Sequence, residues 1–400
     1  MPNLPDHRHC TGCMACVDSC NHGALTLARE QGHIYPQVNP SLCVECGACS
    51  RHCPQLHPKN WNKREDMKVY GGWCTDLEVR RRAASGGAFS ALALSVLQAG
   101  GHVAGAALND DGSVSHRLIS SVEELPLLQN SKYIQSDASG NYRAIRKLLR
   151  EGKQVLFSGT SCQIGGMNSY LGRDFPNLLS VEVVCHGVPA DFARDHLLRQ
   201  TQGKRILSYR DKKGGWNTLQ SQRITYESQE GQAISCNQST DPFYQIFDCA
   251  LIERDTCCNC IYSSLPRYAD ITLADFWGIK RFEEAWQDGI SLIISSNGKG
   301  DHFLNECSNL HLFPSTLEES LRPNPRLVSG RKFHDWHPVL RWRGGMRNAL
   351  GETTYLKVVT NRMPYKLLWG VFKVMTILSN KLAIRKELAY EKEHRNHNHI

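Results

Sequence analysis

The chain has 400 residues, a net charge of +8 and 41% hydrophobic residues, which is enough apolar material for two or three globular domains. The excess positive charge lies in residues 341–400, which carry 12 Lys/Arg and 4 Asp/Glu, whereas the other 340 residues hold 35 of each sign. This distribution argues against nucleic-acid binding by the body of the chain, and no run of 18 apolar residues predicts a transmembrane helix.

Cysteine is the unusual residue type, with 17 copies that mostly lie in tight clusters. The segment Met1–His9 is polar and lacks the apolar core of a signal peptide. Clustered cysteines without an export signal are typical of metal ligation in a reducing compartment. We therefore expect a cytoplasmic protein.

Residues 1–58 contain two copies of the spacing C-x2-C-x2-C-x3-C. The copies are Cys10, Cys13, Cys16 and Cys20, then Cys43, Cys46, Cys49 and Cys53. This is the pattern of bacterial ferredoxins with two [4Fe–4S] clusters, in which the fourth cysteine of each run binds the other cluster. We expect cluster one on Cys10, Cys13, Cys16 and Cys53, and cluster two on Cys43, Cys46, Cys49 and Cys20. Zinc knuckles use paired C-x2-C units and do not fit.

The segment between the two runs, residues 24–42, alternates enough at His33, Ile34, Tyr35 and Val38 to predict a short hairpin. A polar linker is expected at residues 57–67. Strand-like and helix-like segments then alternate, which predicts an α/β body. Strands are expected at 69–74, 102–108, 154–157 and 178–184, and helices at 91–99, 141–150, 191–201 and from about 163 to 171.

Four cysteines of the body form a further candidate set. Cys162 and Cys185 follow predicted strands, whose carboxyl ends gather functional groups in open α/β sheets. Cys257 and Cys260 form a C-x2-C pair; Cys258 lacks that spacing. Four thiolates match the need of a third cubane, and the alternative is that Cys162 and Cys185 are buried structural thiols. Core positions are expected for the isolated cysteines, namely Cys74, Cys236, Cys249 and Cys307.

Several motifs occur in a characteristic order. They are Ser85-Gly86-Gly87, Ser131-Lys132-Tyr133, Gly159-Thr160-Ser161-Cys162-Gln163, Cys185-His186-Gly187, Cys257-x2-Cys260 and Ala269 to Gly278. With this set, residues 66–335 resemble the coenzyme F420 hydrogenase/dehydrogenase beta-subunit family, here joined to a dicluster ferredoxin. Where the family has Gly-Asp-Phe-Trp-Gly, this chain has Ala274-Asp275-Phe276-Trp277-Gly278.

The resemblance implies an FAD-containing iron–sulfur oxidoreductase. It places the flavin near Ser85, Gly86, Gly87, Ser131, Lys132 and Tyr133, with Gly159 and Thr160 as further cofactor-binding residues, and it gives a [4Fe–4S] cluster to Cys162, Cys185, Cys257 and Cys260. From the residues alone, Ser85-Gly86-Gly87 is either a phosphate cradle or a plain helix cap. Arg267 is expected to pair with a flavin phosphate or with Asp270. No catalytic residue is predicted.

The expected fold is an α+β ferredoxin-like dicluster domain (1–58) followed by an α/β flavin- and iron–sulfur-binding body. The body is divided into a flavin-binding domain (66–155) and an iron–sulfur domain (156–335). A flavin exchanges single electrons with clusters and electron pairs with substrates. The predicted function is an oxidoreductase that connects the clusters, through FAD, to a deazaflavin or another two-electron acceptor. The alternative is an electron-transfer subunit that serves a partner enzyme. A redox partner protein or a small electron carrier is expected.

The tail, residues 336–400, is predicted to contain a basic amphipathic helix. Its apolar face is Leu368, Val371, Phe372, Met375, Leu378 and Leu382, and its lysines are Lys366, Lys373 and Lys381. Such a helix either lies on an anionic membrane surface or packs on the body or on a second subunit. The first reading places the protein peripherally at the inner face of the membrane.

Overall fold

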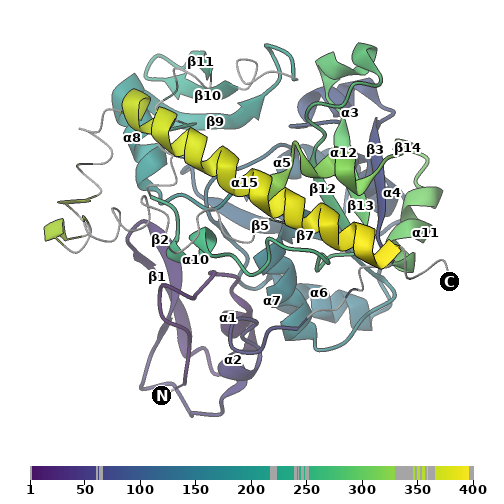
Figure 1. Cartoon of the computed structure of the whole chain (residues 1–400). Coiled ribbons are helices and arrows are strands. Elements are labelled where there is room, and N and C mark those ends of the chain that lie inside the picture. The colour runs from purple at the N-terminus through teal and green to yellow at the C-terminus, as the bar shows by residue number, and fades with distance from the viewer. Residues whose placement is uncertain are drawn as a thin grey trace.

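The computed structural model describes residues 2–59, 62, 66–216, 223–237, 252–328 and 365–395, together with residues 241, 243, 244, 247, 346, 349–351, 354, 355 and 358. It shows a small N-terminal module beside a mixed α/β body, with one long helix lying across the body (Figure 1). This confirms the mixed α/β class with a ferredoxin-like N-terminal module.

The N-terminal module contains the predicted hairpin between two short helices. The elements are α1 (Ala15–Ser19), β1 (Leu25–Glu30), β2 (His33–Val38) and α2 (Ala48–Arg51). β1 and β2 pair antiparallel, and the turn between them is formed by Gln31 and Gly32, which both have positive φ. The residues before the two helices, Met14 and Gly47, share a left-handed backbone conformation, so the two cysteine runs fold alike.

A nine-stranded sheet forms the centre of the body. Its order is β14 (Leu310–Pro314), β3 (Lys68–Cys74), β13 (Ser291–Ser295), β12 (Ile271–Asp275), β8 (Leu178–Val183), β7 (Val155–Thr160), β4 (His102–Leu108), β5 (Val114–Ile119) and β6 (Ser136–Asp137). The central strands β12, β8, β7 and β4 are parallel, and most of the flanking pairs are antiparallel. The segments 66–155 and 156–335 both contribute strands to this one sheet, so their division into two domains remains a prediction.

A second, three-stranded sheet has the order β11 (Ala233–Asn237), β10 (Arg223–Ser228) and β9 (Gly203–Asp211). The helices are α3 (Leu77–Arg82), α4 (Ala88–Gln98), α5 (Leu125–Leu128), α6 (Asn141–Arg150), α7 (Ser161–Leu171), α8 (Phe192–Thr201), α10 (Asp255–Cys258), α11 (Gly298–Glu306), α12 (Leu317–Leu321) and α15 (Tyr365–Arg395), with 3-10 turns η2 (Val122–Glu124), η3 (Glu283–Asp288) and η4 (Pro325–Leu327).

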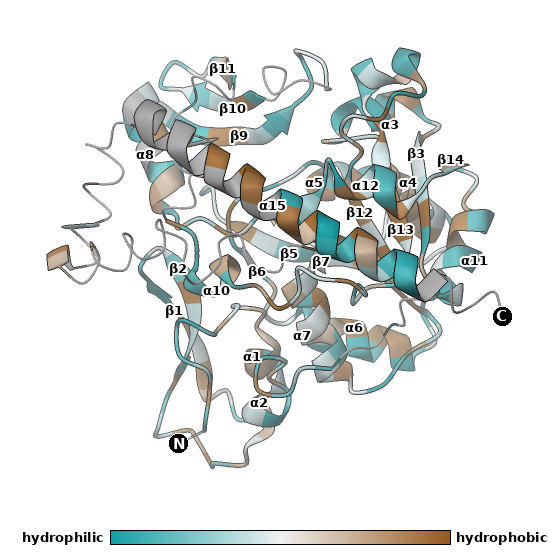
Figure 2. Ribbon diagram, in the orientation of Figure 1, coloured by the Kyte–Doolittle hydropathy of each residue, from teal (hydrophilic) through white to brown (hydrophobic). Residues whose placement is uncertain are grey.

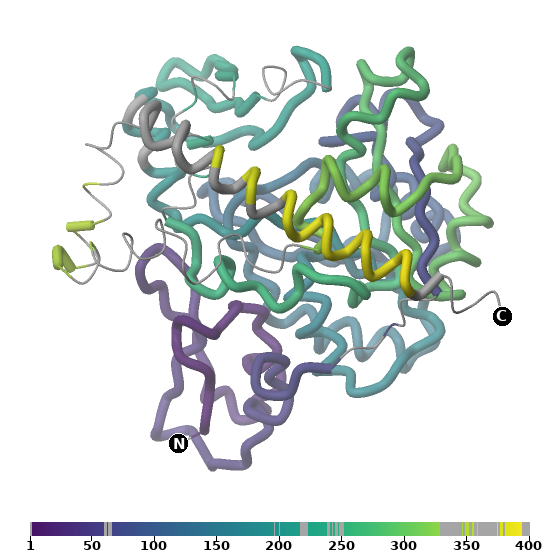
Figure 3. Tube along the Cα trace, in the orientation of Figure 1, coloured from purple at the N-terminus to yellow at the C-terminus, as the bar shows by residue number. Residues whose placement is uncertain are grey.

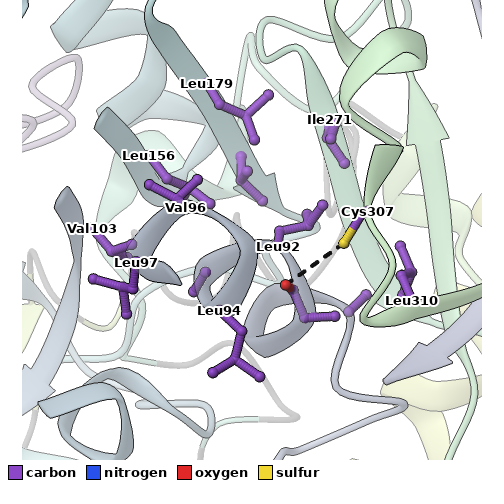
Figure 4. Close-up of a cluster of buried hydrophobic side chains, with 14 of the residues drawn as sticks. Leu92, Leu94, Val96, Leu97, Val103, Leu156, Leu179, Ile271, Cys307 and Leu310 are labelled. Carbon is purple, nitrogen blue, oxygen red and sulfur yellow. Dashed lines mark hydrogen bonds between the residues drawn. The ribbon is translucent and has the colours of Figure 1, made fainter. Parts of the chain in front are cut away.

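Side chains alternate across β7 and so separate two cores. Leu156 faces the core under α4, where Leu92, Val96 and Cys307 are buried (Figure 4). Val155 and Phe157 face the opposite core under α6 and α7. Helix α4 is apolar on nearly all sides because it is almost completely buried. Cys74 and Cys307 lie in the first core, as predicted; Cys249 lies outside the described residues.

The N-terminal module is anchored in the second core. Cys13 and Ala15 are buried there with residues of α6 and α7, and the trace of α1 runs beside both helices (Figure 3). The Asp18 carboxylate accepts hydrogen bonds from the backbone N–H groups of Gly140 (2.6 Å) and Tyr142 (2.9 Å), so it caps the N-terminus of α6. Burial raises the pKa of Asp18, and these N–H donors oppose that shift.

An exposed arginine and a buried arginine complete the anchor. Arg143 donates to the carbonyl oxygens of Val17 (2.8 Å), Asp18 (2.7 Å) and Cys20 (2.7 Å). On the other side of the module, Arg254 is 1% exposed and donates to Cys10 O (2.9 Å) and Ile34 O (2.6 Å). Because these carbonyls would lose their partners if the module moved away, the module is held in one position on the body.

Replacing Asp18 by alanine should therefore destabilise the protein by about 2 kcal/mol, since it leaves the first turn of α6 without its acceptor in a buried place. The matched control is Asp76→Ala, because Asp76 caps α3 by accepting from Val79 N (3.0 Å) at an exposed position. This control should cost less than about 1 kcal/mol. Anaerobic urea unfolding compares the two, and equal losses would contradict a buried anchor.

Candidate functional site

The first group of module cysteines is the expected one. Cys10, Cys13 and Cys53 are buried, and Cys16 lies with them. Burial raises the pKa of Cys13 to about 12, and negative charge on Cys53 and Cys10 raises it further. Burial also raises the pKa of Cys16, followed by the charges of Cys13, Cys10 and Cys53. The structure thus brings together the four thiols that the sequence assigns to cluster one.

The second group lines one cavity of the module. That cavity is bordered by Cys20, Cys43, Cys46 and Cys49, together with Leu25, Val38 and Val44. Cys46 is exposed, whereas Cys49 is buried. The mixed origin of the four thiols, with Cys20 from the first run, follows the exchange of fourth ligands that the spacing predicts.

The body cysteines come from three places and meet at one edge of the large sheet. Cys162 lies in the first turn of α7, directly after β7, and Cys185 follows the neighbouring parallel strand β8. The backbone of Pro189 pairs with that of Glu253, and Arg254 N donates to Val188 O (2.9 Å). These contacts bring α10, with Cys257, and the following Cys260 beside the loop that carries Cys185.

Electrostatics show the same grouping. Burial raises the pKa of Cys162, and the charges of Cys260 and Cys185 raise it further. Burial raises the pKa of Cys185 to about 11, with a further increase from Cys260. Cys257 has a pKa raised by burial and then by Cys185, Cys260 and Cys162. The four thiols therefore influence one another, as required of ligands to one cluster.

Among the described residues, no group of three or more histidine, cysteine or acidic side chains is placed to hold a metal ion. A cubane cluster does not require several ligands around one ion, because each of its four cysteines binds a separate iron. The donor chemistry of the three cysteine groups, four thiols in each, fits [4Fe–4S] clusters.

The Ser85-Gly86-Gly87 loop packs tightly between β3 and β13. A Cβ on Gly86 would lie 2.6 Å from Ser291 N and 2.7 Å from Gly72 O, so only glycine fits there. Gly87 is the N-cap of α4 and has a φ of 82°. Both the phosphate-cradle and the plain-cap interpretations are compatible with this loop, and its role in flavin binding stays a prediction.

Strand β9 connects this loop to the Ser131-Lys132-Tyr133 segment. Asn130 donates to Ser208 Oγ (2.9 Å) and to Arg210 O, and thereby fixes the start of that segment. At the end of β9, Lys212 Nζ donates to Ser85 O (2.7 Å). The two stretches that the resemblance assigns to the flavin begin 46 residues apart in sequence, at Ser85 and Ser131, and both are held by the end of β9.

Gly159 and Thr160 form the end of β7, directly before α7 and Cys162. Thr160 caps α7, and its Oγ1 is 3.1 Å from Cys162 Sγ. Gln163, the capping-box partner of Thr160, also donates to Ser136 O (3.3 Å) on β6. Gly159 and Thr160 thus lie beside Cys162, and their role in cofactor binding stays a prediction.

Sequence reasoning missed the charged residues of β9. Arg210 is buried and pairs with Asp275 at 2.5 Å, and Asp275 also accepts from Trp216 Nε1 (2.8 Å). Trp216 stacks on Trp277, with ring centroids 4.7 Å apart. Burial lowers the pKa of Lys212 to about 7. The Ala274–Gly278 motif indicated Asp275 and Trp277, but no spacing signal links them to β9.

Arg267 does not pair with Asp270. It is buried, forms an ion pair with Glu182 on β8 and donates to Ser161 Oγ (2.6 Å). Asp270 instead accepts from Ser180 and Asn297. Arg267 thus fixes the start of α7 relative to β8, which positions Cys162, and a contact with a flavin phosphate stays a prediction.

Comparison with known proteins agrees with these features. Residues 9–56 match the 4Fe-4S dicluster domain, and residues 152–313 match the C terminus of the coenzyme F420 hydrogenase/dehydrogenase beta subunit. The predicted resemblance is confirmed. Residues 152–313 are thus similar to these beta subunits, and the N-terminal module is a two-cluster iron–sulfur domain.

One solved structure that the chain resembles comes from the F420-reducing [NiFe] hydrogenase complex of Methanosarcina barkeri, studied by xenon derivatization. The identity is 14%, the TM-score is 0.43, and the alignment covers 74% of this chain and 91% of the other. No curated protein matches the sequence.

His116 provides a pH test of the packing beside the predicted flavin segments. It hydrogen bonds to Ser136 Oγ (2.8 Å) and Ser158 O (3.0 Å), and burial lowers its pKa from 6.5 to about 4. The unfolded chain therefore takes up a proton at this residue first, so stability is lost as the pH falls below 6.5 towards 4.

Between pH 7.5 and pH 5.5, the wild-type protein should lose about 1 kcal/mol more stability than the His116→Gln variant. Anaerobic urea unfolding at the two pH values measures this difference. A parallel decrease in both proteins would show that His116 is not held neutral.

Proposed function

We propose that this protein is an iron–sulfur flavoprotein oxidoreductase. It passes electrons between its [4Fe–4S] clusters and a two-electron substrate through FAD, and the substrate is a deazaflavin or another acceptor. The observation that carries the proposal is the serial arrangement of three cysteine groups. The exposed Cys46 lies in the outermost group, Cys13 lies at the contact with the body, and Cys162 lies in the body.

The proposed third cluster is held by Cys162, Cys185, Cys257 and Cys260. Arg267 donates a hydrogen bond to Ser161 and forms an ion pair with Glu182. These two interactions hold the first turn of α7, which carries Cys162, in position relative to β8. The sheet edge thus supplies two of the thiols from adjacent parallel strands, as expected for functional groups in an open α/β sheet.

The proposed flavin site lies beyond Thr160. When bound there, a flavin supplies the exchange between single electrons and electron pairs. The chain itself supplies the Ser85 loop, the Ser131-Lys132-Tyr133 segment and the Lys212 amino group, which donates to Ser85 O. Arg210 is neutralised by Asp275. Lys212 donates to the backbone carbonyl oxygens of Arg80, Ser85 and Asp288. Lys132 donates to that of Gln129.

The alternative function is an electron-transfer subunit for a partner enzyme. It requires the same three cysteine groups, but it does not require a substrate site in this chain. A surface for a redox partner is proposed at the second cluster, because Leu42 and Val44 are exposed apolar residues beside the exposed Cys46. A partner protein that covers them would bring its own redox centre next to the outermost cluster.

The long helix α15 supports both interpretations of the tail. Ile384 and Leu388 pack on the body, whereas Val374, Leu378 and Leu382 are exposed at four-residue intervals. Hydrophobic and hydrophilic residues both occur along α15 (Figure 2). Side chains of Lys366, Leu368, Val371, Phe372, Lys373 and Met375 lie outside the described residues. Among the described residues, no helix is long and apolar enough to cross a bilayer. We propose that the exposed stripe rests on an anionic membrane surface.

Anaerobically purified protein should contain about twelve irons and one FAD, as three clusters and one flavin require. The Cys185→Ser variant should lose about four irons and keep the eight of the module. Cys236→Ser is the matched control, because Cys236 lies outside the three groups and should leave the iron content unchanged. About eight irons and no flavin in the wild type would refute the enzyme proposal.

Mixing the loaded protein with reduced deazaflavin should bleach the flavin absorbance and then the cluster absorbance. If dithionite bleaches the protein and reduced deazaflavin does not, the proposed cofactors stand, and the two-electron substrate is another acceptor. Protein with three clusters and no flavin would favour the electron-transfer subunit.

Replacing Val374, Leu378 and Leu382 together by serine should abolish flotation with vesicles of phosphatidylglycerol and phosphatidylcholine. The control is Leu127→Ser, which changes an exposed leucine outside the helix. If the wild-type protein does not float with such vesicles at low salt, α15 is a packing helix only.

A further inference from the structure

Helix α7 contains two consecutive glycines in its interior, Gly165 and Gly166. Each glycine inside a helix costs about 1 kcal/mol relative to alanine, because it loses more backbone entropy on folding. Neither residue has the positive φ that would require glycine. The reason for the pair must therefore be the space that a side chain would occupy.

That space is filled from two sides. A Cβ on Gly166 would lie 2.9 Å from both Cβ and Sγ of Cys13. A Cβ on Gly165 would lie 2.6 Å from Cε1 of Tyr262. Real Cβ atoms do not approach other atoms so closely, so the two glycines form a notch that admits a module cysteine on one side and a tyrosine on the other.

The notch lies one helical turn from the body cysteines. Cys162 and Gly166 are four residues apart, and such positions are neighbours on one helix face, about 5–6 Å apart at their Cβ atoms. Cys13, in contact with position 166, is thus close to Cys162. Negative charge on each of these cysteines contributes, after burial, to the raised pKa of both Tyr142 and Tyr262.

Tyr142 fastens the same contact. Its hydroxyl donates to Cys13 O (2.7 Å) and to Gln163 O (3.1 Å), so one buried side chain links the module loop to the first turn of α7. Together with Asp18 and Arg254, it leaves the module no freedom to adopt another distance from α7.

We propose that Gly165 and Gly166 are positioning residues that set the separation between the module cluster at Cys13 and the body cluster at Cys162. This inference rests on the proposed third cluster. With both clusters bound, a single electron would pass from one cluster to the other, with no bond broken and no proton moved. The module is thereby a fixed relay of this chain and does not need to detach in order to exchange electrons with the body.

The test is Gly166→Ala in the full chain, purified anaerobically and reduced with dithionite. The added methyl group should push Cys13 away from α7 while all ligands remain. The variant should keep the wild-type iron content and lose part of the magnetic interaction between module and body clusters in the electron paramagnetic resonance spectrum. The Cys185→Ser spectrum supplies the reference for a module without a body cluster.

Gly298→Ala is the matched control, because Gly298 begins α11 and a Cβ there meets nothing within 4 Å. It should leave the spectrum unchanged. If Gly166→Ala does not fold, Tyr142→Phe removes the link between Cys13 O and Gln163 O without adding volume, and it should weaken the same interaction.

The outcomes separate the two proposals. Twelve irons with an unchanged interaction in Gly166→Ala, or in Tyr142→Phe where that variant is used, would overturn the positioning role alone. About eight irons in the wild type would overturn the third cluster and the inference with it. A loss of stability without any spectral change would assign the glycine pair to packing only.

Discussion

The anchoring of the ferredoxin module on α6 and α7 is the constraint on which the rest of the structure depends. The carboxylate of Asp18 takes the place of a helix cap for α6, although it belongs to a different part of the chain. In return, Arg143 and Arg254 use backbone carbonyls of the module as acceptors. Hydrogen-bonded groups of the module and the body are costly to separate, because each donor or acceptor would lose its partner.

A ferredoxin joined to an enzyme by a linker can in principle act as a mobile carrier. Here the linker is short, and the buried contacts on both sides of the module favour a fixed relay. Fixation has a consequence for the cysteines. The group that contains Cys13 lies inside the protein, whereas the group that contains Cys46 remains at the surface. In the proposed function, electrons from outside would therefore enter at the second group and reach the body through the first.

The cysteine runs of the module could be predicted from sequence because their chemistry is local. Three thiolates around one cube require short, regular spacing, and that spacing survives in the primary structure. The body group is different in kind. Cys162, Cys185 and Cys257 meet because β7 and β8 are parallel neighbours and because the chain around Glu253 pairs with Pro189. Strand adjacency of this type leaves no spacing signal, so the sequence supported two interpretations of Cys162 and Cys185.

The helices and strands nearest to the site were predicted well. α6 and β4 have the predicted bounds, and β7 extends three residues beyond the prediction because it continues to the cap at Thr160. Arg210 and Lys212 could not be predicted, since they act through a strand of the smaller sheet that reaches back over the large one. Their pairing with Asp275 and Ser85 is a property of the tertiary fold.

The glycine pair of α7 shows how the two kinds of information combine. In the sequence, Gly165 and Gly166 only weaken the expectation of a helix, because glycine is a poor helix former. In the structure they are the positions where a neighbour approaches too closely for a side chain. The helix preference of these positions is lost in favour of a long-range contact, which places the module cysteine Cys13 against α7, the helix that carries Cys162. Residues that disfavour the secondary structure in which they lie, without any local structural need for them, often occur at functional sites. For this chain, that reasoning points to the junction between the module cysteines and the body cysteines.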